Sequence, residues 1–214
     1  MSFLWLVEQP LWYLAATIFV IGVFWRLYGL IALGKRQDLS VARGSGTGGA
    51  IRALLLHFIP HGGFFSKTFF HFLAGYAFHL GFFALLLFAA PHVTFIEERI
   101  LGVGWTPLPR WGFILVAQIS FAGLIFLWAR RISDPVQRQI SDGDDHAGTW
   151  LTFIAMLTGC LALQESSDVL RGLHMLSVEV WLIYFPFSRL MHAFTWVFSR
   201  ANMGAVFGRR GVTP

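Results

Sequence analysis

Long stretches without charged side chains alternate along the chain with short segments that hold most of the Lys, Arg, Asp and Glu residues. The longest runs from Thr68 to Ile96. A helix needs about 20 mostly apolar residues to cross the hydrocarbon core of a bilayer. The pattern therefore predicts an all-α bundle of five transmembrane helices, over residues 11–33, 68–92, 111–129, 148–165 and 173–198. Nothing in the sequence resembles the period-2 alternation of β-barrel strands.

Composition supports the same interpretation. Of the 214 residues, 13% are charged and 17% are aromatic, whereas a soluble domain carries about 25% charged residues. These values exclude a disordered chain and an ordinary soluble domain. The single cysteine, Cys160, excludes an internal disulfide. We expect residues 1–214 to form one integral membrane domain.

The distribution of Lys and Arg predicts the orientation of the helices. Eleven of the 16 lie in the segments after the first, third and fifth predicted helices, and three lie on the opposite side. Cytoplasmic loops are enriched in Lys and Arg, so the N-terminus is expected outside and the C-terminus in the cytoplasm. No Lys or Arg precedes Arg26, which does not fit a cleaved signal peptide. The predicted location is the inner (cytoplasmic) membrane, and we assign the net charge of +5 to cytoplasmic loops rather than to nucleic-acid binding.

Two loops contain patterns that suggest other chemistry. The glycine-rich run 44–49 has no GK[ST] sequence, so we do not expect a phosphate-binding loop. The following segment, 52–65, is apolar with two histidines and is a candidate interfacial segment. The acidic cluster of loop 133–146 suggests a metal site, but a solvated loop is the stronger expectation for Asp142, Asp144 and Asp145.

Five of the eight histidines fall within predicted spans. His71, His79 and His92 lie in the second, and His174 and His192 lie in the fifth. Ionisable residues inside a membrane are costly and usually functional, although a single intramembrane histidine also serves as a helix–helix hydrogen-bonding residue. Histidines on two antiparallel helices can bind a haem iron from both sides, each through a neutral imidazole nitrogen. The pattern therefore predicts haem binding.

Spacing suggests two haem sites, one above the other. His174 and His192 are 18 residues apart, which in a continuous helix is five turns and about 27 Å on one face. We pair His79 with His192 as the inner haem ligands and His92 with His174 as the outer ones. An alternative in which His71 and His79 are the two ligands of the second helix stays open.

Three motifs resemble those of a known family. They are Leu173-His174 followed by FPFSRLMH over 185–192, RRISDPVQR over 130–138, and FHLG over 78–81. Together they resemble the membrane cytochrome b family of the respiratory nitrate reductase gamma subunit. That family has two ligands ten residues apart in its second helix, and the equivalent position here is Ala89 rather than His92. This departure suggests a divergent relative, from a heterodisulfide-reductase-like or sulfur-metabolism complex, rather than nitrate reductase itself.

The resemblance implies electron transfer between the quinone pool and a cytoplasmic partner through b-type haems. Two haems are expected and one is possible. The implied partner is an iron–sulfur, heterodisulfide-reductase-like or molybdenum enzyme subunit, because this chain has no cysteine cluster of its own. Within the fifth span, Glu179 is a candidate proton acceptor from quinol, and Arg189 is a candidate partner for haem propionates.

Two other functions compete with this interpretation. A membrane metal transporter would use the intramembrane histidines as transient ligands. A structural anchor would hold a soluble enzyme at the membrane with one haem or none. Absorption by a reduced b-type haem distinguishes both from a di-haem electron carrier.

Overall fold

The computed structural model describes residues 2–34, 39–60, 63, 65–163 and 167–212. Every regular element in these residues is a helix, so the all-α prediction is confirmed for them. Three of the residues used in the sequence analysis, Lys35, Arg36 and His61, lie outside the described residues, as does the end of the predicted span 148–165.

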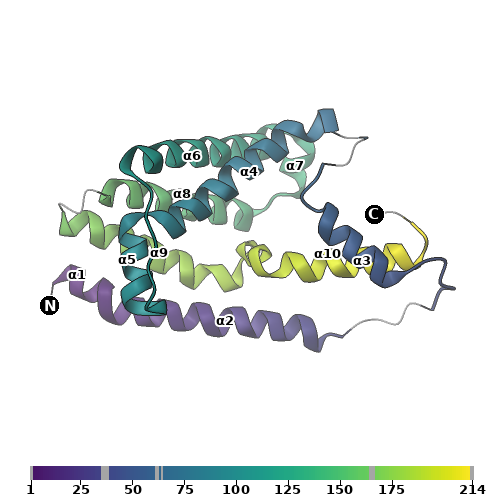
Figure 1. The fold of residues 1–214 in the computed structure, drawn as a ribbon, viewed down its shortest axis with the longest axis horizontal. Helices are drawn as coiled ribbons and strands as arrows, with labels where there is room; N and C mark the ends of the chain where they lie inside the picture. The colour runs from purple at the N-terminus through teal and green to yellow at the C-terminus, as the bar shows by residue number, and fades with distance from the viewer. Residues whose placement is uncertain (1, 35–38, 61–62, 64, 164–166, 213–214) are drawn as a thin grey trace. The chain divides into compact units, whose positions relative to one another are not determined.

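The longer helices are α2 (Trp12–Ala32), α4 (Phe65–Phe88), α6 (Arg110–Ser133), α8 (Gly143–Ala162), α9 (Asp168–Tyr184) and α10 (His192–Arg209) (Figure 1). The shorter helices are α1 (Phe3–Leu6), α3 (Gly46–Leu56), α5 (Ala90–Ile96) and α7 (Pro135–Ile140). Single turns of tighter or wider helix are η1 (Val7–Leu11), η3 (Glu97–Leu101), η4 (Phe185–Phe187) and η5 (Arg189–Met191).

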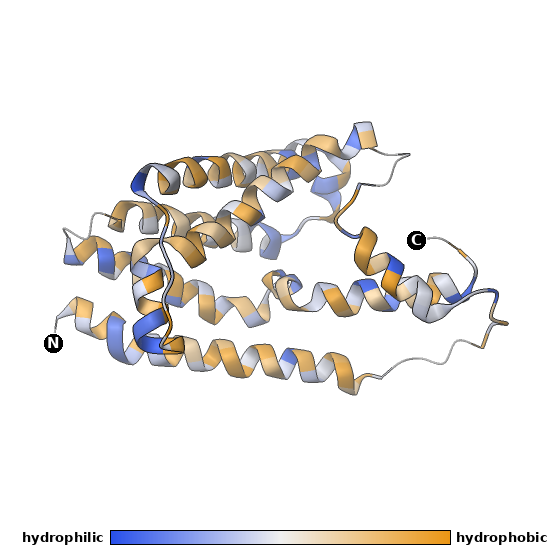
Figure 2. Ribbon diagram, in the orientation of Figure 1, coloured by the Kyte–Doolittle hydropathy of each residue, from blue (hydrophilic) through white to orange (hydrophobic). Residues whose placement is uncertain are grey.

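Three helical segments among the described residues are long and apolar enough to cross a membrane. They are Phe3–Ala32, Phe65–Phe88 and Arg110–Ser133. Figure 2 shows that hydrophobic residues dominate α2, α4 and α6 along most of their length. Large apolar side chains on these helices are exposed, including Phe24 (68%) and Tyr28 (71%). Such a surface is expected where the surroundings are lipid rather than water.

The segment 173–198 is not one continuous helix, contrary to the sequence prediction. Helix α9 ends at Tyr184, and α10 begins at His192 after η4 and η5. Pro186 has no backbone N–H and does not continue a helix. Ser188 is extended, and its hydroxyl oxygen accepts a hydrogen bond from the backbone N–H of Leu190 (3.2 Å). The axial spacing that we calculated for a continuous helix therefore does not apply to His174 and His192.

The predicted helix 68–92 is also divided. Helix α4 ends at Phe88, and Ala89 is extended before α5 begins. Pro91 lies in the first turn of α5, where a backbone N–H has no partner within the helix, so its missing N–H costs nothing there. Near the end of α4, the indole N–H of Trp105 donates to the carbonyl of Leu87 (2.8 Å).

The chain divides into two compact units, which we describe separately. Unit 1 contains Met1–Ala16 and Phe69–Ile183, and unit 2 contains Thr17–Thr68 and Tyr184–Pro214. Unit 1 therefore holds most of α4 together with α5 to α9, and unit 2 holds α3, α10 and most of α2.

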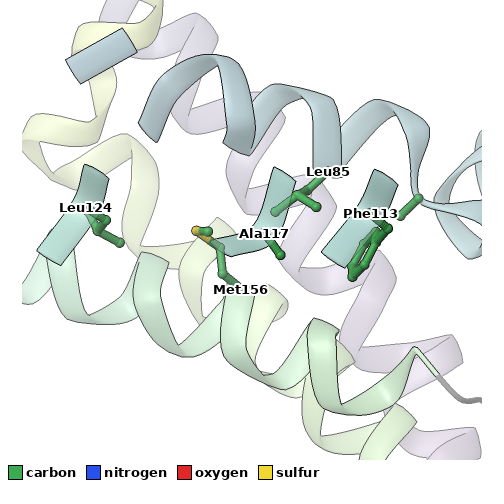
Figure 3. Packing of buried hydrophobic residues seen from close by; sticks show 6 residues of the cluster. Leu85, Phe113, Ala117, Leu124 and Met156 are labelled. Atoms are coloured by element: carbon green, nitrogen blue, oxygen red, sulfur yellow. The ribbon is translucent and has the colours of Figure 1, made fainter. Parts of the chain in front are cut away.

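The core of unit 1 lies between α4, α6 and α8. Its buried members are Leu85, Ala89, Phe113, Ala117, Leu124 and Met156, and Figure 3 shows five of them by name. Small residues let α4 and α6 approach closely. A Cβ on Gly123 would lie 2.7 Å from the carbonyl oxygen of Ala74, and the Ser120 hydroxyl donates to the carbonyl of Phe78 (3.1 Å). This is the close packing through small and hydroxyl residues that membrane helices use.

The acidic residues of loop 133–146 are used structurally. The Asp142 side chain accepts hydrogen bonds from the N–H groups of Asp144 and Asp145, forming a capping box at the start of α8. The carboxylate of Asp145 also forms an ion pair with Arg131 (3.1 Å). Asp134 caps α7 in the same way. These side chains therefore stabilise two helix starts.

Glycines bring α3 and α10 into contact in unit 2. A Cβ on Gly204 would lie 2.5 Å from the Cβ of Ala53 and against the carbonyl oxygen of Gly49. A Cβ on Gly208 would lie 2.7 Å from the Cα of Gly49. Gly204 and Gly208 are one helical turn apart, as in the GxxxG pattern of closely packed membrane helices. We call this contact the glycine seam.

Candidate functional site

Unit 1 brings together two of the predicted haem ligands, His92 and His174. His92 lies on α5 and His174 lies on α9. Their ring centres are 5.9 Å apart, and the ring planes are inclined by 18°. They lie 82 positions apart in the sequence, so their proximity is a property of the fold.

The break after α4 places the imidazole of His92. The last four carbonyls of a helix have no partner within the helix. At the end of α4, the Nδ1 of His92 lies 3.0 Å from the carbonyl oxygen of Leu86 and 3.2 Å from that of Leu85. The backbone N–H of Leu108 donates to the carbonyl of Phe88 (2.8 Å). The interruption at Ala89 therefore lets the side chain of His92 cap the end of α4.

The imidazole of His174 lies against α8. A Cβ on Gly159 would lie 3.0 Å from the Cε1 atom of His174, so the ring occupies the space above a glycine backbone. The Oγ1 of Thr158 is 3.2 Å from the Nδ1 of His174. The Thr158 hydroxyl also donates to the carbonyl of Ile154 (2.8 Å). The hydroxyl of Ser177 lies 2.8 Å from the Oγ1 of Thr158 and donates to the carbonyl of His174 (2.7 Å), so two hydroxyl groups lie beside the Nδ1 side of the ring.

The contacts of His92 select one tautomer of its ring. A neutral imidazole carries one N–H and one nitrogen with a lone pair. A carbonyl oxygen only accepts hydrogen bonds, so the Nδ1 of His92 carries the N–H and its lone pair is on Nε2. The Nδ1 of His174 faces a hydroxyl group, which can donate or accept. A metal-binding histidine commonly donates its other N–H to a backbone carbonyl or a similar acceptor, which fixes the tautomer and the ring orientation.

His79 and His192 have the same kind of local contact. The Nδ1 of His79 is 2.7 Å from the carbonyl oxygen of Gly75, and the Nδ1 of His192 is 2.8 Å from that of Arg189. His79 belongs to unit 1 and His192 to unit 2. Their pairing therefore stays a prediction from the sequence.

The rings of His92 and His174 are close enough to bind one metal ion together, since their centres lie 5.9 Å apart. Within the part of the chain that the structure describes, no group of three or more His, Cys, Asp or Glu residues is arranged to hold a metal ion. A haem iron needs only two protein ligands.

Glu179 is deeply buried in unit 1. Its exposed fraction is 2%, and neither carboxylate oxygen has a hydrogen-bond partner among the described residues. It lies on α9 five residues after His174, which places it about 140° around the helix from that residue. Glu179 therefore belongs to a different face of α9. Arg189 lies in η5 of unit 2, where its carbonyl accepts the hydrogen bond from His192.

Sequence reasoning missed Thr158 and Gly159. Both are common residue types in membrane helices, and no spacing rule connects them with His174. Their contacts with the ring of His174 can be recognised only in the structure, where α8 packs against α9.

Replacing Thr158 with valine should weaken the haem binding that the sequence predicts at His174, without removing the ligand. The change keeps the side-chain shape but deletes the hydroxyl beside Nδ1, and loss of such a supporting hydrogen bond commonly costs about 10- to 100-fold in metal affinity. Haem retention of the purified protein during dilution measures this. Thr158→Ser keeps the hydroxyl and is the matched control. Equal haem retention by the valine and serine variants would show that Thr158 does not position His174.

Comparisons with known proteins give one distant relative. A protein of Nitratidesulfovibrio vulgaris (strain Hildenborough) is 27% identical to this chain over 202 residues, which cover 93% of the chain and 83% of that protein. No family model matches the chain, and no solved structure matches it. The chain is thus similar over nearly its whole length to a protein from that bacterium.

Proposed function

We propose that this chain is a membrane cytochrome b subunit that carries electrons between the quinone pool and a cytoplasmic iron–sulfur partner. The arrangement of His92 and His174 is the observation that supports this proposal most strongly. Their ring centres lie 5.9 Å apart, and the Nδ1 atoms of both rings have hydrogen-bond partners within the protein. His92 and His174 would be the two residues that hold a b-type haem in unit 1, each through an imidazole nitrogen.

The proposal places the chain in the inner membrane with five transmembrane helices. Three helical segments have the required length and composition, and α8 and α9 are the proposed fourth span and the first part of the fifth. The Lys and Arg distribution supports an external N-terminus and a cytoplasmic C-terminus. In this orientation α5 lies on the outer side, which makes His92 and His174 the outer ligand pair.

A second haem would be held by His79 and His192 toward the cytoplasmic side. Both histidines have the Nδ1 hydrogen bond to a carbonyl oxygen of their own helix or turn, which leaves Nε2 as the ligating nitrogen. Arg189 immediately precedes this region, and its guanidinium suits a propionate of that haem. When bound, the two haems supply one-electron transfer across the bilayer.

Glu179 is the proposed proton acceptor for quinol oxidation on the outer side. Quinol must release protons when it gives up electrons, and a carboxyl group without another hydrogen-bond partner can receive one. Glu179 meets this condition among the described residues and is almost completely buried. The remaining residues of the chain hold the ligands in place and exclude water.

The arrangement favours electron transfer over the two competing functions. A transporter site would be expected to combine histidines with carboxylates, whereas Glu179 is on a different face of α9 from His174. An anchor would not require His92 and His174 to lie next to each other. The relation to the nitrate reductase gamma family rests on the sequence motifs and is part of the proposal.

Reduction of the protein by a quinol tests this function. Addition of quinol to the purified protein in detergent should produce a b-type haem spectrum. Glu179→Gln should slow this reduction about a hundredfold, because a positioned acid or base typically contributes at least that factor. The haem content after reduction by dithionite should stay unchanged in the variant. A quinol reduction rate equal to that of the wild type would remove Glu179 from the proposal, and absence of any quinol reduction in the wild type would contradict the proposed function.

A further inference from the structure

Charge is distributed unequally between the two units. Unit 2 contains ten of the 16 Lys and Arg residues but one of the 11 Asp and Glu residues, so its formal charge is +9. Unit 1 has a formal charge of −4. Such an asymmetry indicates a partner of opposite charge for the basic part of the chain.

The glycine seam determines which side of α3 faces outward. Gly49 and Ala53 are buried against α10. The opposite side of α3 and the turn after it carry exposed apolar residues, with exposed fractions of 54% for Ile51, 69% for Leu55 and 60% for Ile59. We call Ile51, Leu55 and Ile59 the α3 outer face.

Arginines lie on α3 and near both of its ends. Arg52 lies on α3 itself and is exposed. Arg43 precedes the helix, where its backbone N–H donates to the carbonyl of Arg209 (2.8 Å). At the other end of α3, His57 stacks on Trp196 with ring centres 5.1 Å apart. Burial lowers the pKa of His57, and the nearby positive charge of Arg200 lowers it further. Positive charge is therefore present at both ends of the helix and along it.

The two possible membrane spans on either side of α3 in the sequence limit how far α3 can lie from the bilayer. Two of the segments that are long enough to cross a membrane precede and follow it along the chain, one ending at Ala32 and the other beginning at Phe65. Nine residue steps separate Leu56 from Phe65, which an extended chain can span over at most about 30 Å. An apolar helix face with flanking arginines, tethered at this distance, fits the headgroup region.

We propose that the α3 outer face, with Arg43, Arg52 and Arg200, binds the anionic lipid headgroups of the adjacent leaflet. The apolar residues enter the boundary between headgroups and acyl chains, and the guanidinium groups bind lipid phosphates. This surface is separate from the proposed haem ligands of unit 1. It depends on the membrane location of the chain but not on haem binding.

Fluorescence quenching in nanodiscs tests the proposal with the full chain. A Cys160→Ser background carries a single new cysteine, Leu55→Cys, labelled with an environment-sensitive dye. Trace amounts of doxyl-labelled phosphatidylglycerol should quench the dye much more strongly than the same fraction of doxyl-labelled phosphatidylcholine. Arg52→Gln and Arg200→Gln should each lower this preference about fivefold, since one basic residue near an anionic surface contributes about that factor. Ile51→Cys provides a second labelling position.

Two further labels separate the possible failures. A label at Leu115, which is 50% exposed on α6, should be quenched equally by both lipids if α6 crosses the membrane. A label at Gln139 on α7 should be quenched weakly by both. Equal quenching at Leu55 by the two lipids would overturn the proposal, as would quenching no stronger than at Gln139. Burial of the Leu55 label only after a soluble protein is added would assign the surface to a protein partner instead. Absence of quenching at Leu115 by either lipid would contradict the membrane location of the chain.

Discussion

The His174→Ala variant is expected to retain one haem b of the two that we propose for the wild type. An alanine cannot ligate iron, and His92 alone leaves one axial position without a protein nitrogen. The loss should be confined to the outer site, because His79 and His192 are the proposed ligands of the inner one. His92→Ala should give the same haem content, although this variant also removes the hydrogen bonds to the carbonyls of Leu85 and Leu86.

Pyridine haemochrome spectra of the purified variants measure this effect. His71→Ala is the control, since it removes a histidine of α4 that the favoured pairing does not use. Two haems in His71→Ala and one in His174→Ala would support the pairing of His92 with His174. Retention of both haems by His174→Ala would exclude it, and loss of a haem from His71→Ala would instead favour the alternative pairing through His71 and His79.

The second large effect is expected at the glycine seam. Gly204→Ala introduces a Cβ that would lie 2.5 Å from the Cβ of Ala53 and against the carbonyl oxygen of Gly49. Backbone atoms cannot move aside as a flexible side chain does, so α3 and α10 must separate. We expect a loss of about 1 to 3 kcal/mol in stability, as for other overpacking substitutions. The direction of the change in stability is informative, because replacing glycine with alanine ordinarily stabilises a helix by up to about 1 kcal/mol.

Thermal unfolding and limited trypsin digestion measure the change. Separation of α3 from α10 should expose the peptide bond after Arg52, so the variant should be cleaved there faster than the wild type. Gly29→Ala is the matched control, since a Cβ at Gly29 meets nothing within 4 Å. If Gly204→Ala were as stable and as resistant to trypsin as Gly29→Ala, α3 and α10 would not pack as described.

The helical character of the chain could be predicted because lipid imposes a strong constraint on sequence. Soluble domains seldom contain apolar stretches of about 20 residues, and α2, α4 and α6 follow the predicted spans closely. The interruptions were not predicted. Pro186 and Pro91 were visible in the sequence, but proline is tolerated in membrane helices when other groups bond to the freed backbone. Trp105, which bonds to the Leu87 carbonyl, is 18 residues away from it.

The candidate site was predictable in its ligands but not in its supporting contacts. Histidines in apolar stretches indicate a function because burying them is costly. His92 had the weaker support from sequence, since it follows Pro91 and departs from the family spacing. The structure gives a physical reason for its position, because the helix is interrupted at Ala89 and the ring of His92 lies at the end of α4. Thr158 and Gly159 acquire their role only through the packing of α8 on α9.

The glycine seam could be predicted from the sequence only in part. Gly204 and Gly208 form a recognisable GxxxG pattern on α10. Their partner, Gly49, belongs to the glycine-rich run 44–49, most of which is the start of α3. A glycine-rich run can be a flexible loop or the start of a closely packed helix, and the difference depends on whether another helix is in position to contact it.

The haem b content per polypeptide of the wild-type protein is the most direct test of the proposed di-haem cytochrome. Pyridine haemochrome absorbance, divided by the protein concentration from amino-acid analysis, gives this ratio without any assumption about the partner subunit. We expect two haems per chain, held by His92 with His174 and by His79 with His192. One haem per chain would contradict the two-site arrangement, and none would contradict the proposal that the chain is a cytochrome.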